Sequence, residues 1–172
     1  MTLGTRIVVM KDGLVQQVDT PQNLYNNPGN LFVAGFIGSP QMNFIDVEIK
    51  EEGGTVNAVA GDTSLKVPTG KAKALVDAGY VGKTVVMGIR PEHLHDSEMF
   101  IETAKDSIIE STIRVYELLG AEVYLYFDYA GAQMTARVDP RTTAKTGDNV
   151  QFALDMEKAH FFDKEDGLTI VN

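Results

Sequence analysis

The Gly82-Lys83-Thr84 triplet is the first feature that could do chemistry, because the same residue types end the phosphate-binding loop of many NTPases. That loop also needs a glycine five residues before Gly82, where this chain has Asp77. It leads from a strand into a helix whose N-terminal N–H groups bind the phosphates. Here a predicted helix, at about 70–78, precedes the triplet and a predicted strand follows it. The pattern therefore predicts a β-turn and no nucleotide site.

Two polar clusters could suggest a metal site, but their spacing argues against one. His93 and His95 lie just after Pro91, in a stretch that the proline predicts to be a strand end or a solvated loop. No further histidine is close in sequence to complete a zinc shell. Residues 163–167 lack the alternating Asp pattern and the distal Glu of a calcium loop. We therefore expect no metal and no cofactor in this chain, and a structural role near a strand end for His160.

Composition and charge exclude several classes of function. The 172 residues include no cysteine, which excludes a thiolate zinc site, a thiol nucleophile and a disulfide. There is no Ser-His-Asp spacing and no nucleophile elbow, so we predict that the chain itself is not an enzyme. The 15 Lys and Arg against 24 Asp and Glu give a net charge of −9, which opposes binding to nucleic-acid phosphates. The tyrosines that could stack on bases have mostly acidic neighbours, which favours sheet packing or a protein interface: Tyr116, Tyr124, Tyr126 and Tyr129.

The elements that must position these residues change in type near residue 40. Before that point the sequence predicts a hairpin over 7–18, built on an Asp-Gly turn. A short helix should follow, with Thr20 as N-cap and Pro21 in the first helical position. A second short helix is predicted over about 30–36, ended by glycine and proline. This opening segment is α/β in character.

After residue 40 the sequence predicts many short strands with frequent turns and one convincing helix. Ile45, Val47 and Ile49 alternate with charged residues, which is typical of a strand with one buried face. The expected strands are 44–50, 55–60, 64–67, 84–90, 108–117, 122–128, 133–138, 149–155 and 168–171. This pattern predicts an antiparallel barrel or sandwich.

One internal similarity relates two of these strands. Residues 82–92 match residues 147–157 in register, since each stretch begins with a glycine turn, continues as a strand and ends at a glutamate. Such a match indicates two related half-units in the β part. Two strands of this length also match by chance, so the sequence leaves both interpretations open.

Several motifs, taken in order, carry a resemblance to a known family. They are residues 6–13, 20–21, 24–25, 32–40 (Phe-Val-Ala-Gly-Phe-Ile-Gly-Ser-Pro), 42–44, 88–94 (Gly-Ile-Arg-Pro-Glu-His-Leu), 117–120 and 160–163. Together they resemble the junction of the ATPase domain and the regulatory domain in ABC importer ATPases of the maltose and multiple-sugar type. The resemblance covers essentially the whole chain.

The resemblance implies two parts: residues 1–38 as the end of a nucleotide-binding domain, and residues 39–172 as an OB-type regulatory domain of the transport-associated kind. The expected fold class is therefore mainly β, an OB-type antiparallel barrel with a short α/β remnant of an ATPase domain. The family's phosphate-binding loop, signature sequence and switch histidine have no match in the chain. ATP and Mg would then be bound by an upstream domain of a longer parent protein, which couples ATP hydrolysis to sugar uptake.

The resemblance also implies partners. In this family the regulatory domain pairs with its twin across the ATPase dimer, and in some members it binds inhibitory proteins of the sugar phosphotransferase system. We expect a homodimer through this domain, membrane permease subunits as partners of the parent ATPase domain, and a cytoplasmic location on the inner face of the membrane. The expected interface residues are Leu118, Leu119, Gly120, Arg90, Glu92 and His93, and the expected junction residues are Phe36, Gly38, Ser39 and Pro40.

A second function from a different class stays open. Transport-associated domains resemble small-ligand binders, so the chain could be an OB-type module that holds a sugar or an oxyanion. Calorimetry with sugars and oxyanions distinguishes the two functions, because only a binding module gives heat.

The opening segment poses a separate question, because an isolated two-stranded hairpin is marginally stable and exposes a sheet edge. Residues 1–38 are therefore expected to be poorly ordered, docked on the β domain, or paired with another copy of the chain. The apolar residues of the second helix favour the last of these.

Overall fold

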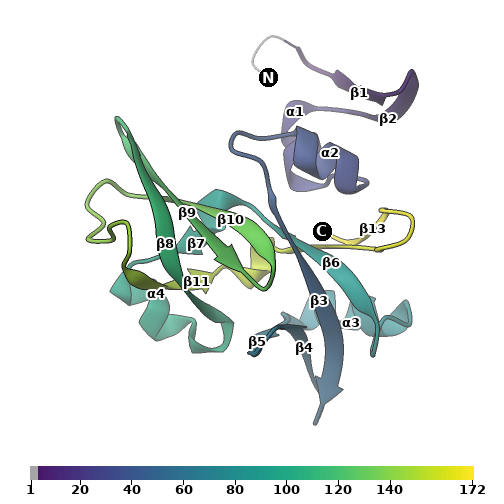
Figure 1. Ribbon diagram of the computed structural model, residues 1–172. Coiled ribbons are helices and arrows are strands. Elements are labelled where there is room, and N and C mark those ends of the chain that lie inside the picture. The colour runs from purple at the N-terminus through teal and green to yellow at the C-terminus, as the bar shows by residue number, and fades with distance from the viewer. Residues whose placement is uncertain (1–3) are drawn as a thin grey trace.

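The fold consists of antiparallel strands connected by a few short helices (Figure 1). The computed structural model describes residues 4–172. The strands are β1 (Ile7–Lys11), β2 (Leu14–Asp19), β3 (Asn43–Glu52), β4 (Thr55–Ala60), β5 (Thr63–Lys66), β6 (Thr84–Ile89), β7 (Leu94–His95), β8 (Ile108–Leu119), β9 (Glu122–Tyr129), β10 (Ala132–Val138), β11 (Asn149–Leu154), β12 (His160–Phe162) and β13 (Thr169–Val171). The helices are α1 (Pro21–Asn26), α2 (Leu31–Phe36), α3 (Thr69–Asp77) and α4 (Glu98–Thr103), with 3-10 helices η1 (Pro91–His93), η2 (Lys105–Ser107) and η3 (Met156–Lys158).

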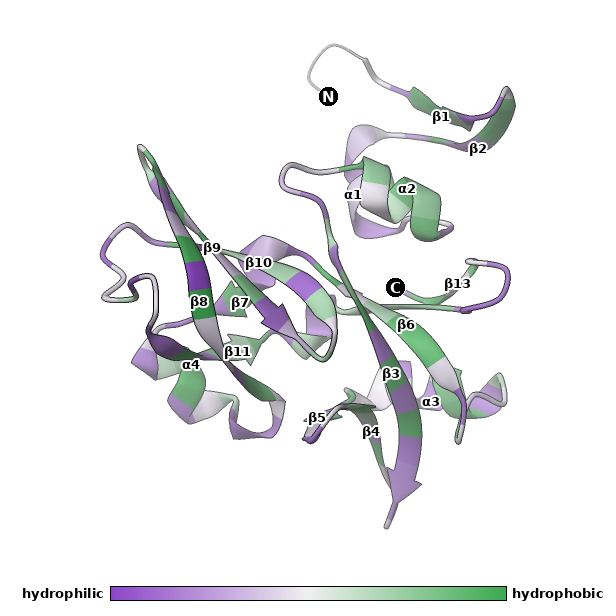
Figure 2. Cartoon of the chain, viewed as in Figure 1, coloured by the Kyte–Doolittle hydropathy of each residue, from purple (hydrophilic) through white to green (hydrophobic). Residues whose placement is uncertain are grey.

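Two sheets enclose the main core. One has the strand order β13-β12-β6-β3-β4-β5 and the other β10-β9-β8-β11-β7, while β1 and β2 form a separate hairpin. Val47 of β3 and Leu125 of β9 belong to the same buried cluster. Phe127 of β9 stacks on Phe152 of β11, with ring centroids 4.7 Å apart. The predicted antiparallel β architecture is confirmed, and the predicted alternation along β3 is visible as bands of opposite hydropathy (Figure 2).

Asn43 joins the two sheets at the start of β3. Its side-chain amide donates a hydrogen bond to the carbonyl of Thr135 at 2.9 Å and accepts one from the Thr135 N–H at 2.8 Å. The side chain thereby pairs with β10 as a strand backbone would. Asn43 is 4% exposed, so these two bonds satisfy polar groups that would otherwise be buried without partners.

The opening segment has the predicted elements. Asp12 and Gly13 both have positive φ, of 50° and 78°, as a hairpin turn of type I′ requires. Thr20 caps α1 by accepting from Asn23 N at 3.2 Å, and Asn30 caps α2 by accepting from Val33 N at 2.9 Å. A small buried cluster holds the segment together: Val9, Leu24, Val33 and Ile37.

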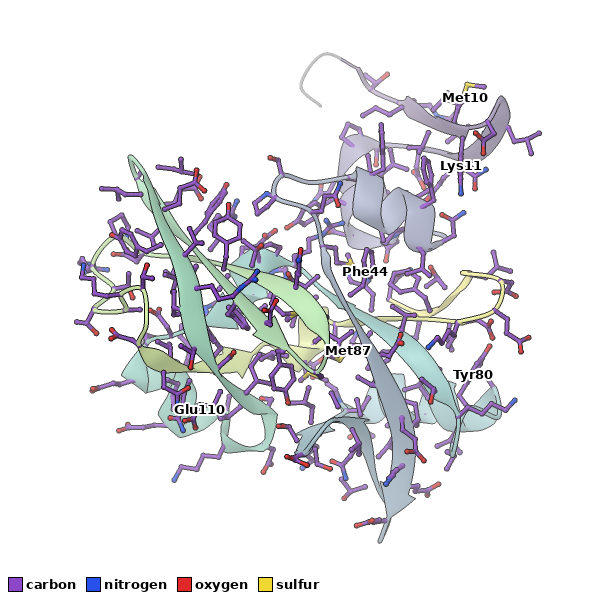
Figure 3. All side chains as sticks on the ribbon, in the orientation of Figure 1. Met10, Lys11, Phe44, Tyr80, Met87 and Glu110 are labelled. Atoms are coloured by element: carbon purple, nitrogen blue, oxygen red, sulfur yellow. The ribbon has the colours of Figure 1, made fainter. Side chains whose placement is uncertain are left out.

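This segment is docked on the β part. Leu31 N donates to the carbonyl of Gly167 at 2.8 Å, and Thr169 Oγ1 donates to the carbonyl of Pro28 at 2.6 Å. Phe44 of β3 packs beneath α2, where a Cβ on Gly35 would lie 3.3 Å from its ring (Figure 3). Of the three expected states, the structure shows docking for residues 4–38, and residues 1–3 lie outside the described part. Pairing with another copy stays a prediction, as does the domain boundary at residue 38.

The structure corrects the sequence prediction after β6. Helix α4 was not predicted. His93 and His95 were predicted in a solvated loop, but they lie in η1 and β7 and are half-buried. The His95 ring stacks on Phe100 of α4, with centroids 4.0 Å apart, and this contact explains how so short a helix is held in place. His160 is the first residue of β12, so its predicted place at a strand end is confirmed.

The internal similarity has a structural counterpart. The orders β6-η1-β7 and β11-η3-β12 are the same: strand, 3-10 helix, short strand. The short strands are exchanged, since β12 pairs with β6 and β7 pairs with β11. His160 lies opposite Gly88, and His95 lies opposite Ala153, the residue that matches Gly88 in the other half. This reciprocal pairing favours two related half-units over a chance match.

Gly88 has no room for a side chain. A Cβ there would lie 2.4 Å from Met42 Sδ and 3.0 Å from a Phe162 ring carbon. We expect Gly88→Ala to lower the free energy of unfolding by roughly 1–3 kcal/mol, because overpacking forces neighbours from their positions. Gly70→Ala in α3 is the matched control, since nothing lies within 4 Å of its Cβ position. Denaturant unfolding measures both variants, and equal stabilities would contradict this packing.

Candidate functional site

The contact between residues 4–38 and the β part, here called the junction, is centred on Arg90. This residue directly follows β6 and is 1% exposed. Its Nη1 donates to the carbonyl of Ile37 at 2.7 Å, and its Nη2 donates to the carbonyl of Tyr25 at 2.7 Å. The guanidinium carbon lies 3.9 Å from the centroid of the Tyr25 ring. One buried cation therefore contacts both helices of the opening segment.

The local sequence explains why Arg90 finds acceptors there. Tyr25 lies in the last turn of α1 and Ile37 is the C-cap of α2, and helix ends leave carbonyl groups without intrahelical partners. Cations are favoured at such ends. Gly38 has a φ of 113°, and a Cβ on it would lie 2.8 Å from Arg90 Nη1. The glycine thus provides both the left-handed backbone and the space for the guanidinium.

Electrostatics at the junction are unusual because no carboxylate neutralises Arg90. None of the ion pairs within residues 4–172 includes it. Burial lowers the pKa of Arg90 to about 10, which leaves it charged at neutral pH. Burial, together with the nearby cations, lowers the pKa of His160 to about 4, so that this ring is neutral. Arg90 Nε and His93 Nδ1 are buried without a hydrogen-bond partner in the described part of the chain.

Of the predicted junction residues, Gly38 touches the guanidinium directly. Ser39 and Pro40, joined by a cis peptide bond, lead from the opening segment into β3. Phe36 is 63% exposed and stacks on Phe32, with centroids 5.7 Å apart. Of the expected junction residues, Gly38 lies against Arg90, Ser39 and Pro40 form the connection to β3, and Phe36 is mostly exposed.

The predicted interface residues fall into two groups. Leu118 and Leu119 are 58% and 43% exposed at the end of β8, and Gly120 forms the turn to β9 with a φ of 64°. Glu92 is two residues after Arg90, and its Oε2 lies 3.9 Å from Arg137 Nη2. Arg137 Nε also lies 3.1 Å from Glu122 Oε2. Glu122 pairs with Leu119 across the hairpin. Arg137, absent from the sequence prediction, connects the two groups; their role in an interface stays a prediction.

Three residues near Arg90 were missed by the sequence reasoning. Tyr25 was noted only as a helix residue, Lys71 was not singled out, and His160 was taken as structural. The last two line a cavity beside the guanidinium. The signal that could have found His160 was the 65-residue offset, which aligns it with His95.

Other predicted features can be placed as well. The Gly82-Lys83-Thr84 triplet forms the turn between α3 and β6, with a φ of 82° at Gly82, as predicted. Among the described residues no group of three His, Cys, Asp or Glu side chains could hold a metal ion. None of the helices in residues 4–172 has the length and apolar composition to cross a membrane.

Comparison with known proteins shows which domains the chain contains. Residues 38–94 match the MalK OB fold domain, and residues 87–162 match the TOBE domain. The chain is 46% identical, over 165 residues, to the oligosaccharides import ATP-binding protein MsmX of Bacillus subtilis. It is 42% identical, over 175 residues, to the multiple sugar-binding transport ATP-binding protein MsmK of Streptococcus mutans. The chain therefore contains the MalK OB fold and TOBE domains, and over nearly its whole length it is similar to part of sugar-import ATP-binding proteins.

The similarity to these sugar-importer relatives covers 96% of this chain but only 44% of MsmX and 46% of MsmK. A solved structure of the cytoplasmic molybdate-binding protein ModG superposes with a TM-score of 0.51 and 16% identity, over 73% of this chain and 96% of that chain, which shows a common fold alone. Arg90 lies in residues 87–94, where the OB fold match and the TOBE match overlap. The cation that contacts the opening segment thus lies where the two domains meet.

Replacing Arg90 tests its role at the junction. We expect Arg90→Lys to lower stability by roughly 2–3 kcal/mol, because an ammonium group cannot donate to both carbonyls and stack on Tyr25 at once. Amide hydrogen exchange should then accelerate in α1 and α2 before it does in β3 and β6. Arg114→Lys is the matched control, since Arg114 is half exposed and pairs only with Asp128. Uniform acceleration over the whole chain would contradict a role confined to the junction.

Proposed function

We propose that this chain is the regulatory and dimerisation part of the ATP-binding subunit of a carbohydrate ABC importer. The observation that carries the proposal is the OB fold and TOBE pair within a similarity that covers 96% of the chain. In the whole protein, ATP and Mg would be bound by the part of the relatives that this chain does not match. The chain itself then contributes no ATP hydrolysis, and residues 4–38 would continue into the ATPase domain.

Dimerisation through the β part is supported by the exposed end of the β8–β9 hairpin. Leu118 and Leu119 end the strand that also contains Val115, which is 50% exposed, and this end of the hairpin is coloured as hydrophobic (Figure 2). Exposed apolar residues gathered at one place are typical of protein contacts. A two-fold contact would place the same leucines of both copies together, because such interfaces use one surface twice.

The remaining partners follow from the same proposal. The whole protein would work with membrane permease subunits and lie on the inner, cytoplasmic face of the membrane, a role that fits the import and transport functions named for MsmX and MsmK. A regulatory protein of the sugar phosphotransferase system is a further partner that the proposal allows. Binding of a sugar or an oxyanion by an OB-type module is not favoured, since the ModG likeness, at 16% identity, supports the fold alone.

The dimer proposal predicts an effect of charge at the hairpin end. We expect the double variant Leu118→Asp, Leu119→Asp to sediment as a monomer at concentrations where the unchanged chain dimerises, because the carboxylates would be buried without partners. Val76→Asp is the control, since Val76 is 37% exposed on α3, away from the hairpin. An unchanged chain that stays monomeric at high concentration would contradict the proposal.

The proposal also predicts that the chain does not bind ATP. A fluorescent ATP analogue titrated with Mg should show no saturable binding at micromolar concentrations, because Gly82–Thr84 is a turn that leads into a strand. Lys83→Ala should leave the signal unchanged. Saturable binding that Lys83→Ala abolishes would contradict the prediction that the chain does not bind ATP.

A further inference from the structure

Helix α4 borders two cavities at the surface of the β part. None of its residues is buried, and Met99 and Phe100 are 69% and 41% exposed. Phe100 lines a cavity of about 320 Å³, here called the apolar cavity. The next residue, Ile101, lines a different cavity of about 540 Å³, here called the acidic cavity. Exposed apolar side chains gathered beside a cavity are typical of an interaction site.

The apolar cavity suits a single bulky side chain. Six of its lining residues are apolar: Pro68, Phe100, Ala104, Ala153, Leu154 and Met156. The Phe100 ring is held at this cavity by its stack on His95, with centroids 4.0 Å apart. The volume is at the low end of the roughly 300–1,000 Å³ found for small-molecule sites. Partner proteins commonly place one large anchor residue in a pocket of this kind.

Carboxylates without cations line both cavities. None of the lining residues that the structure describes is a lysine or an arginine, whereas five are acids: Asp155 and Glu157 in the apolar cavity, and Asp96, Glu110 and Asp148 in the acidic cavity (Figure 3 labels Glu110). None of the five belongs to an ion pair within residues 4–172. Asn149 donates to Glu110 and Thr142 donates to Asp96, but both donors are neutral. The negative charge around α4 is therefore uncompensated.

This charge decides between the possible occupants of the surface. A second copy in a two-fold contact would bring the same carboxylates together, and like charges across an interface are unfavourable. Anionic lipid headgroups and nucleic-acid phosphates are repelled for the same reason. A basic protein segment fits both features, because its cations would face the carboxylates while an apolar side chain enters the apolar cavity.

We propose that α4 and its two cavities form a docking surface for a basic segment of another protein, with a bulky apolar side chain as its anchor. Met99 and Phe100 would pack on the anchor, and the five carboxylates would face lysines or arginines on either side of it. Amphipathic segments bind grooves in this way, through spaced apolar anchors. Electrostatic complementarity of this kind selects the partner and speeds its association.

The docking surface is separate from the hairpin end proposed for the dimer. Helix α4 lies near the start of β8, while Leu119 ends this strand (Figure 1). The 12 residues of β8 place about 35 Å between the two ends. A partner on α4 would therefore leave the hairpin end free, and the proposal does not depend on the dimer.

The test is fluorescence anisotropy of labelled peptides with the 172-residue chain. The peptide KKLFKK has basic flanks and an apolar anchor, KKAAKK lacks the anchor, and EELFEE reverses the charge. We expect saturable binding of one KKLFKK per chain and no binding of EELFEE. KKAAKK should bind about tenfold more weakly or worse, because it buries no large apolar side chain.

Variants of the chain locate the binding site. Glu110→Lys should weaken KKLFKK binding by about tenfold, because it replaces an attraction at the surface by a repulsion. Glu165→Lys is the matched control: Glu165 is also exposed and in no ion pair of the described residues, but it lies between β12 and β13. Ala104→Phe fills the apolar cavity and should lower the affinity for KKLFKK to that for KKAAKK.

Several outcomes would overturn the proposal. They are absence of KKLFKK binding at millimolar concentrations, equal binding of KKLFKK and KKAAKK, and equal weakening by Glu110→Lys and Glu165→Lys. The last comparison stays valid if Ala104→Phe fails to fold. The NMR signals of residues 98–103 should shift with KKLFKK, and shifts confined to residues 118–120 would contradict docking on α4. A change of oligomeric state in Glu110→Lys, measured by sedimentation, would show that a second copy covers α4 instead.

Discussion

A buried guanidinium without a carboxylate partner is the constraint on which the rest of this structure depends. Among the described residues, Nη1 and Nη2 of Arg90 bond only to the carbonyls of Ile37 and Tyr25, and the Tyr25 ring stacks on the guanidinium; the opening segment supplies all of these groups. If that segment left, the charge would be buried without acceptors or would have to draw water into the junction, and both are costly. Since Arg90 also follows β6, the central partner of β3 and β12, the junction and the six-stranded sheet form one connected unit.

The exchanged half-units explain why this cation lies next to a cavity. At the 65-residue offset Arg90 matches Asp155, and His160 matches His95. Arg90 and His160 line a cavity of about 250 Å³ at the junction, while Asp155 and His95 line a second cavity of about 320 Å³ together with Phe100 and Met156. The equivalent positions of Arg90 and Asp155 thus carry opposite charges. Phe100 of α4 stacks on His95, whereas the neighbours of the His160 ring are Asn172 and Phe162 of the β part.

The fold was largely predictable because its signals are local. Alternation along β3, the Asp12-Gly13 turn and the Thr20-Pro21 cap each depend on neighbouring residues, and each is present in the structure. The junction was predictable only through a family resemblance. An arginine in a sequence predicts an exposed side chain. No residue near Arg90 in the sequence indicates that its guanidinium donates to carbonyls 53 and 65 residues away. Helix α4 was missed since its six residues are held by a tertiary stack.

The junction and the hairpin end are connected, but the connection is not mainly electrostatic. Glu92, two residues after Arg90 in the chain, pairs with Arg137, which also pairs with Glu122, the residue opposite Leu119. These side chains are partly exposed, and ion pairs of that kind contribute at most about 1 kcal/mol. The stiffer route is the backbone, because Asn43 ties β3 to β10 and β10 pairs along its whole length with β9. A displacement at the start of β3 would therefore reach the hairpin through paired strands, and Asn43, at 4% exposed, is the link that such a movement would have to carry or break.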